Sequence, residues 1–84
     1  SPALARAVAG AAAGLRSIDL YKPPGVAETI DWASALARLG HDHLDDATVT
    51  ATLGVVLKYR EDHARVREMG IAEVLAAGVH AIGH

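Results

Sequence analysis

Histidine and carboxylate side chains are the groups in this 84-residue sequence that could do chemistry. The stretch from 41 to 46 reads HDHLDD, which places two imidazoles around one aspartate with two more aspartates close behind. A transition metal could bind such a cluster, but the fixed spacing of a motif such as HExxH is absent. A solvated connector between two helices explains the stretch more simply, and we predict no metal site.

The other polar residues do not form a recognisable catalytic set. His63 lies among acidic and basic residues that are typical of a surface helix, and no partner can be identified for His80 or His84. The chain has no cysteine, and Ser34 lacks the GxSxG context of a nucleophile elbow. Neither a Walker-type GxxxxGKS/T loop nor a GxGxxG motif is present. We therefore predict no catalytic residue and no enzymatic activity for this chain alone.

Composition restricts the partners and the compartment. The net charge is −2 at pH 7, which argues against a basic surface for nucleic acid. No apolar run approaches the roughly 18 residues that a membrane span requires. Without cysteine, a reducing compartment is the default, so we expect a cytoplasmic protein. The chain does not begin with methionine, which suggests a fragment or a processed chain.

Apolar residues at helical spacing predict one all-α domain over residues 1–84, a small bundle of four or five short helices. The first helix is expected from about Pro2 to Leu15 or Ser17. Gly10 and Gly14 each lower its intrinsic stability by roughly 1 kcal/mol, so they either permit a close helix crossing or mark a helix that depends on its neighbours. Its inward face is expected to carry Leu4, Val8, Ala11, Leu15 and Ile18.

A second helix should begin near Val26, because Pro23 and Pro24 end any preceding helix. Gly40 supplies a left-handed stop. One inward stripe is expected, made of Val26, Ile30, Ala33 and Ala37 and widened by Trp32, Leu36 and Leu39.

A third helix has a clear start signal, since Asp45 can cap it, Asp46 suits its positive end and Leu44 can pack on Val49. Its inward residues are expected to be Val49, Leu53, Val56 and Leu57. The following LKYREDHARVREMG is either a fourth helix after a bend near 58–60 or an extension of the third, with charges that suit exposed pairs such as Glu61 with Arg65. Gly70 ends it.

The last segment, 71–84, has another helical stripe: Ile71, Val74, Leu75, Gly78, Val79 and Ile82. This stripe needs a cover that the other short helices do not obviously provide. Exchange of the segment between two copies of the chain is one way to bury it.

The stretch from 21 to 32, YKPPGVAETIDW, places two prolines and a glycine directly ahead of a helix. Together, KPPGVAETIDWASAL and the later LDDATVTATLGVVLKYREDHARV resemble the C-terminal lid subdomain of MoxR-type AAA+ ATPases. The nearest branch is the one linked to carbon monoxide dehydrogenase accessory proteins. The resemblance covers roughly Ile18 to Arg67, and residues 71–84 are its least supported part.

This resemblance implies a helical lid that follows a P-loop ATPase core and closes over ATP and Mg²⁺ at a subunit boundary of a ring. The expected partners are that core, the neighbouring subunits and an unidentified protein substrate, in a chaperone-like remodelling or metalloenzyme maturation role. The helix start would face the nucleotide, with its free N–H groups suited to a phosphate. The implied nucleotide-binding residues are Lys22, Pro24, Gly25, Val26, Ala27 and Glu28.

One feature departs from the family pattern. Many AAA+ lids carry a sensor-2 arginine at this helix start, whereas here Lys22 is the nearest cation and Arg38 lies further along. Glu28 would repel phosphate unless it is paired, for instance with Lys22, although it suits the helix dipole. Two alternatives therefore stay open: a proline-rich turn without ligand contact, and a free-standing helical protein–protein interaction module.

Overall fold

The computed structural model describes the backbone of residues 2–82 and the side chains of residues 2–79. These residues form five helices and no strand, which confirms the all-α prediction. The segment after the third helix forms a separate fourth helix, because residues 57–59 leave the helical conformation. The helices are α1 (Pro2–Ser17), α2 (Val26–Arg38), α3 (Asp46–Val56), α4 (Arg60–Met69) and α5 (Ile71–Ile82).

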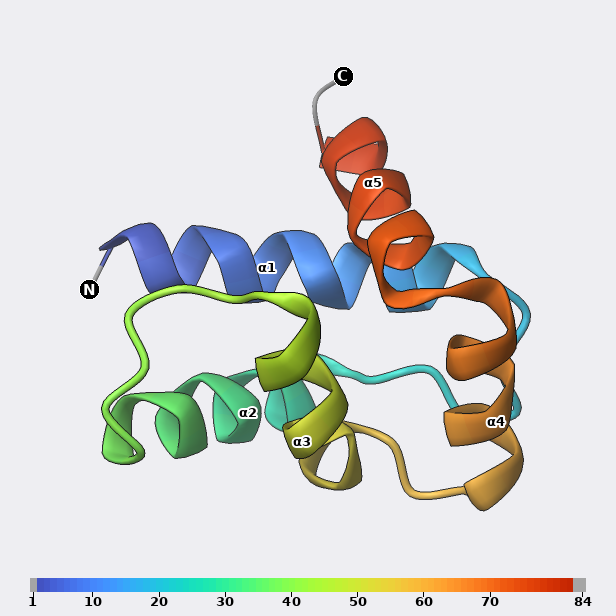
Figure 1. Ribbon diagram of the computed structural model, residues 1–84, viewed down its shortest axis with the longest axis horizontal. Helices are drawn as coiled ribbons and strands as arrows, with labels where there is room; N and C mark the ends of the chain where they lie inside the picture. Colours follow the sequence, from blue (N-terminus) through green and yellow to red (C-terminus); the bar gives the residue numbers. More distant parts are fainter. Residues whose placement is uncertain (1, 83–84) are drawn as a thin grey trace.

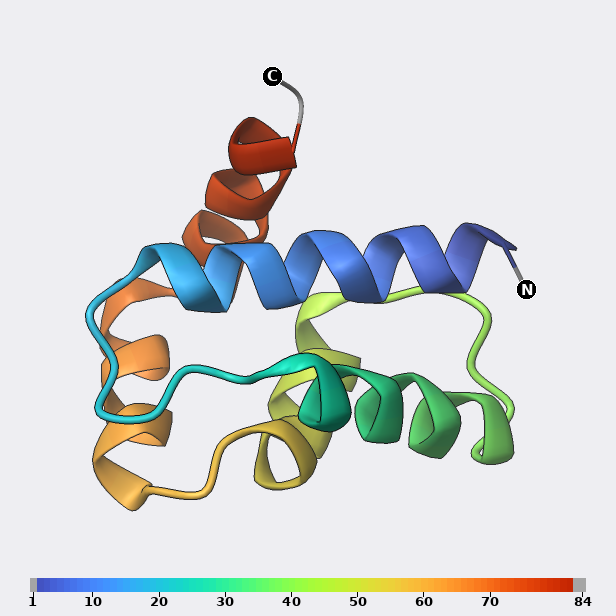
Figure 2. The same ribbon diagram turned by 180° about the vertical axis from the view of Figure 1, so that it is seen from behind.

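The five helices are arranged around α1, the longest of them (Figure 1). On one side of α1 lie α2, which runs in the opposite direction, and α3. On the other side α5 crosses α1 steeply, and α4 connects the two groups at the end where α1 finishes (Figures 1 and 2). α5 makes most of its contacts with α1, and α2 packs mainly on α3.

The interior is built around Trp32, whose side chain is fully buried. Its indole Nε1 donates a hydrogen bond of 2.8 Å to Oγ1 of Thr52, which donates in turn to the carbonyl oxygen of Thr48 at 2.8 Å. The polar atoms of this cluster therefore retain partners inside an apolar core. The surrounding buried side chains are Leu4, Val8, Ala11, Leu15, Leu36, Val49, Leu53, Val56, Leu57, Val66, Ile71 and Val74. The inward residues predicted for α1 and α3 lie in or against this core.

The prediction for the inward face of α2 was right for Trp32 and Leu36 and wrong for most of the other residues. Trp32 and Leu36, one turn apart, fill the interior, whereas Val26 and Ile30 are 76% and 59% exposed and Ala37 is also exposed. Two overlapping apolar stripes compete on this helix, and the larger side chains bury more area when they face the core. We call the exposed set of Val26, Ile30 and Ala37 the outer stripe of α2. Ala33 is half-buried, and Leu39, beyond the end of the helix, is exposed.

α1 and α5 cross at glycines. A Cβ at Gly14 would overlap the carbonyl oxygen of Val74, and a Cβ at Gly78 would overlap that of Gly10. Of the two explanations for the glycines of α1, the structure therefore supports the first, that they permit a close crossing of two helices. This contact buries Ile71 and Val74 within one chain, so exchange between two copies is not needed to cover them.

The remainder of the α5 stripe follows the prediction in part, with Gly78 buried. Leu75 is half-buried against the core, whereas Val79 is 67% exposed although the preceding Gly78 lies against α1. The side chain of Ile82 and those of His80 and His84 lie outside the described residues.

The helix ends use the residues that the sequence indicated. Gly40 has φ +81°, and the N–H groups of Gly40 and His41 donate to the carbonyls of Ala37 and Leu36, both at 3.0 Å. This is the hydrogen-bond pattern of a Schellman motif. At the start of α3, Asp45 accepts from the N–H of Thr48 at 2.8 Å.

Candidate functional site

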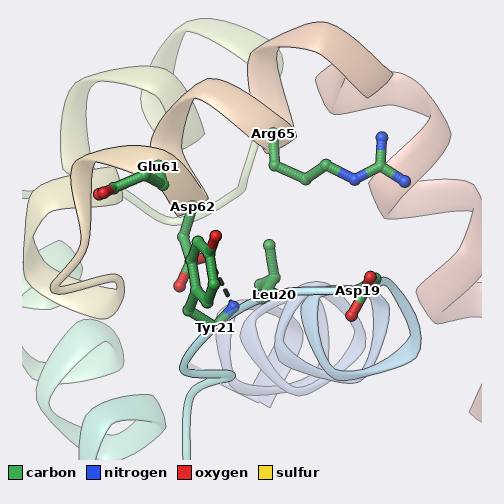
Figure 3. Close-up of a pocket in the computed structure, with 6 residues that line it drawn as sticks. All are labelled: Asp19, Leu20, Tyr21, Glu61, Asp62 and Arg65. Atoms are coloured by element: carbon green, nitrogen blue, oxygen red, sulfur yellow. Dashed lines mark hydrogen bonds between the residues drawn. The ribbon is translucent and has the colours of Figure 1, made fainter.

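The segment ahead of α2 is held by a buried carboxylate of α4. Asp62, 1% exposed, accepts from the backbone N–H of Tyr21 through Oδ1 at 2.8 Å and from that of Lys22 through Oδ2 at 3.0 Å. Figure 3 shows Asp62 reaching down from α4 to the segment that carries Tyr21. We call this contact the Asp62 bridge. It joins positions about 40 residues apart in the chain.

Burial in the core and one long hydrogen bond also hold the same segment. Ile18 and Leu20 are partly buried against the core, and Pro24 is fully buried. Nη1 of Arg16 lies 3.4 Å from the carbonyl oxygen of Pro24, a long hydrogen bond from the end of α1. The prolines restrict φ, and the Asp62 bridge sets the path of the chain between α1 and α2.

The N-terminus of α2 is capped by its own glutamate. Oε1 of Glu28 accepts from the N–H of Gly25 at 2.9 Å, and the hydroxyl of Thr29 donates to the carbonyl of Gly25 at 2.7 Å. No ion pair joins Lys22 to Glu28 within the described part of the chain. The carboxylate instead lies at the positive end of the helix, where it stabilises the helix dipole.

The six residues predicted to face a nucleotide are neighbours in space but differ in accessibility. Lys22, Gly25, Val26 and Ala27 are exposed, and Glu28 is half-buried. Pro24 is buried, so its contribution is to backbone position and not to ligand contact. The first-turn N–H groups of a helix have no intrahelical partner. Here the residues that carry them, Val26 and Ala27, are exposed and lie beside the carboxylate of Glu28. An anion at this helix start would have to bind beside that negative charge.

The histidine cluster is a capping arrangement at the surface. Nδ1 of His43 lies 2.7 Å from Oδ1 of Asp42, and its Nε2 lies 3.7 Å from Oδ2 of Asp45. The hydrogen bond to Asp42 raises the pKa of His43, and that with His43 lowers the pKa of Asp42. Hydrogen bonds from Thr48 lower the pKa of Asp45. Within the described residues, no group of three or more histidine and carboxylate side chains converges as a metal site would require.

His63 has a structural contact instead of a catalytic geometry. Its Nε2 lies 2.7 Å from the carbonyl oxygen of Leu57, and the carbonyl can only accept, so Nε2 donates. This bond closes the turn between α3 and α4. Glu61 and Arg65, expected as an ion pair, are not within salt-bridge distance in the part of the chain described.

Sequence reasoning missed Asp62 and Thr52 as positioning residues. A signal for Asp62 was present, since it precedes the buried Val66 by four residues and so shares the inward face of the fourth helix. An acidic residue on an apolar face indicates a buried acceptor that needs donors. The donors could not be identified, because they are backbone N–H groups of a distant segment.

No protein-family model matches the chain, and searches of curated proteins and of solved structures found no significant match. Within residues 2–82, no helix combines the length and apolarity that crossing a bilayer requires.

Proposed function

We propose that this chain is the helical lid of a MoxR-type AAA+ ATPase, which closes over ATP and Mg²⁺ held by a P-loop core and relays the nucleotide state in a chaperone-like remodelling or metalloenzyme maturation role. The observation that carries the proposal is the Asp62 bridge. It joins the two sequence runs on which the resemblance rests, one around Lys22 and the other around Asp62. The two runs are therefore in direct contact, and this contact fixes the start of α2.

The outer stripe of α2 supports the same proposal. A helix that is apolar on both sides suits a position between two packed bodies, and α2 faces its own core with only one side. Val26 and Ile30 would then be covered by the P-loop core or a neighbouring subunit. Lys22 and the exposed first turn would lie at the edge of that contact.

The same stripe also favours the second candidate, a free-standing interaction module that binds a partner helix. The coding sequence upstream of this chain distinguishes the two. A Walker A motif within about 250 residues supports the lid, because that motif supplies the phosphate-binding loop that this chain lacks. Its absence would leave the interaction module.

The decisive experiment uses the protein that carries both parts. If the Asp62 bridge sets the lid geometry, Asp62→Asn should lower kcat for ATP hydrolysis about tenfold or more, because small displacements at a closing interface are costly. The matched control is Asp31→Asn on the exposed side of α2, with no expected change. Equal kcat values for the two variants would contradict the proposal.

A titration of the 84-residue chain with Mg·ATP, followed by the amide signals of residues 22–29, gives an independent check. The lid proposal expects no saturable response at micromolar ATP, because the phosphate-binding groups belong to the core. Micromolar binding would mean that the segment is a nucleotide site by itself, and the proposal of a lid without its own site would be wrong.

A further inference from the structure

Two tyrosine rings and a glutamate line a surface hollow beside the Asp62 bridge. The rings of Tyr21 and Tyr59 have centroids 6.4 Å apart and planes at 78° to each other. Together with Glu61 they line a hollow of about 320 Å³, which we call the tyrosine hollow. Tyr21 is 79% exposed and Tyr59 is 49% exposed, so both rings are accessible to a partner.

Glu61 forms no ion pair with Arg65, one turn further along the same helix, within the described part of the chain. Figure 3 shows the side chains of Glu61 and Arg65 leaving α4 in opposite directions. Arg65 lines the adjacent hollow, of about 280 Å³, which Asp19, Tyr21 and Glu61 also line. Among the residues that the structure describes, no cation lines the tyrosine hollow, although Lys58 and Arg60 flank Tyr59 in the sequence.

The backbone that carries the three residues is fixed. The N–H of Tyr21 donates to Asp62, and the carbonyl of Tyr59 accepts from the N–H groups of Asp62 and His63 at 3.1 and 3.2 Å. The first turn of α4 thus holds both tyrosines. A site with a fixed backbone loses less conformational entropy when a ligand binds than a site on a loose loop does.

From this geometry we propose that the tyrosine hollow binds an arginine side chain of a partner protein. Aromatic faces attract cations, and a planar guanidinium can stack on one ring while its edge donates two hydrogen bonds to a carboxylate. An apolar side chain would desolvate Glu61 without giving it a partner, and an anionic one would be repelled. The proposal does not depend on nucleotide binding, so it stands or falls separately from the lid proposal.

The test is a titration of the full 84-residue chain at low ionic strength, followed by the NMR signals of Tyr21, Tyr59 and Glu61. The probe is N-acetyl-arginine N-methylamide, compared with its citrulline analogue, which keeps the planar shape but has no charge. We expect saturable shifts at these three residues and about tenfold weaker binding of the citrulline probe. Equal affinity for the two probes, or shifts mapping to other residues, would overturn the proposal.

Variants separate the contributions of charge and ring. Glu61→Gln should weaken binding of the arginine probe about tenfold, whereas Glu68→Gln, an exposed residue of the same helix, should not. Tyr59→Phe should retain binding and Tyr59→Ala should lose it, with the fold of each variant checked by circular dichroism. If Glu61→Gln bound the arginine probe as tightly as the unmodified chain does, the proposal would be wrong. Equal affinity for the corresponding lysine amide would overturn the preference for arginine.

Discussion

Asp62 is a buried carboxylate whose donors are backbone N–H groups. Charged groups inside a protein are normally paired with an opposite charge or with several donors, and here the two donors of the Asp62 bridge come from Tyr21 and Lys22. The residue therefore links stability to the position of the segment ahead of α2. Residues that look like surface charges in an alternating sequence can have this role.

Replacing Asp62 tests this view. Asp62→Asn can accept from only one of the two N–H groups and presents its own donor to the other, so we expect a loss of about 2–4 kcal/mol in the free energy of unfolding. Urea denaturation followed by Trp32 fluorescence measures it. Asp31→Asn, on the exposed side of α2, should change this free energy by less than about 0.5 kcal/mol. A loss no larger than that of the control would show that the bridge adds nothing.

The His43 pair predicts a dependence of stability on pH. The pKa of His43 is raised, chiefly by its hydrogen bond to Asp42, so its contribution is complete below its ordinary value of 6.5 and is lost as pH rises through the folded-state pKa. The pKa of Asp42 is lowered from 3.8, chiefly by the same hydrogen bond, so its contribution is complete above 3.8 and is lost as pH falls. The pair is fully formed between these values.

NMR titration of the His43 ring measures the effect directly. In Asp42→Asn the pKa of His43 should fall toward 6.5, and in Asp46→Asn, which removes a charge that does not contribute to the shift, it should stay as in the unmodified chain. No change in Asp42→Asn would mean that the pair does not form in solution.

At the scale of elements, the glycines of the helices have different roles. Gly14 and Gly78 lie where α1 and α5 cross, and there a Cβ meets the backbone of the other helix. Gly54, on the exposed side of α3, has nothing within 4 Å of such a Cβ. The same substitution should therefore have opposite effects in the two places.

Gly14→Ala should destabilise the protein by about 1–3 kcal/mol, because backbone atoms cannot yield as a flexible side chain can. Gly54→Ala should stabilise it by about 0.5–1 kcal/mol through helix propensity. Thermal unfolding of the two variants against the unmodified chain gives both signs. A stabilising Gly14→Ala would mean that α5 does not cross α1 as described.

At the scale of the whole molecule, α2 is covered on one side only. Its inner residues, Trp32 and Leu36, belong to the core, whereas the outer stripe of Val26, Ile30 and Ala37 faces solvent. Isolated apolar residues on a surface are ordinary. A stripe along one helix is the feature on which the proposed contact with a second body rests.

Two alanine variants determine which stripe faces inward. Leu36→Ala should cost about 2–5 kcal/mol of folding free energy, as expected for a buried leucine. Ile30→Ala should change that free energy by less than about 0.5 kcal/mol in the chain alone. Chemical denaturation of both variants provides the comparison. If Ile30→Ala cost as much as Leu36→Ala, the outer stripe would be buried in solution, for instance between two copies.

The sequence by itself determined the helical class and the caps at Gly40 and Asp45, together with the inward faces of α1 and α3. These features depend on residues within a turn or two of each other, so periodicity and cap chemistry are sufficient to predict them. Only the tertiary structure decided which stripe of α2 faces the core, how close α1 and α5 approach, and which donors satisfy Asp62. Each of these depends on contacts between segments far apart in the chain. Local sequence patterns do not indicate which distant segments come into contact.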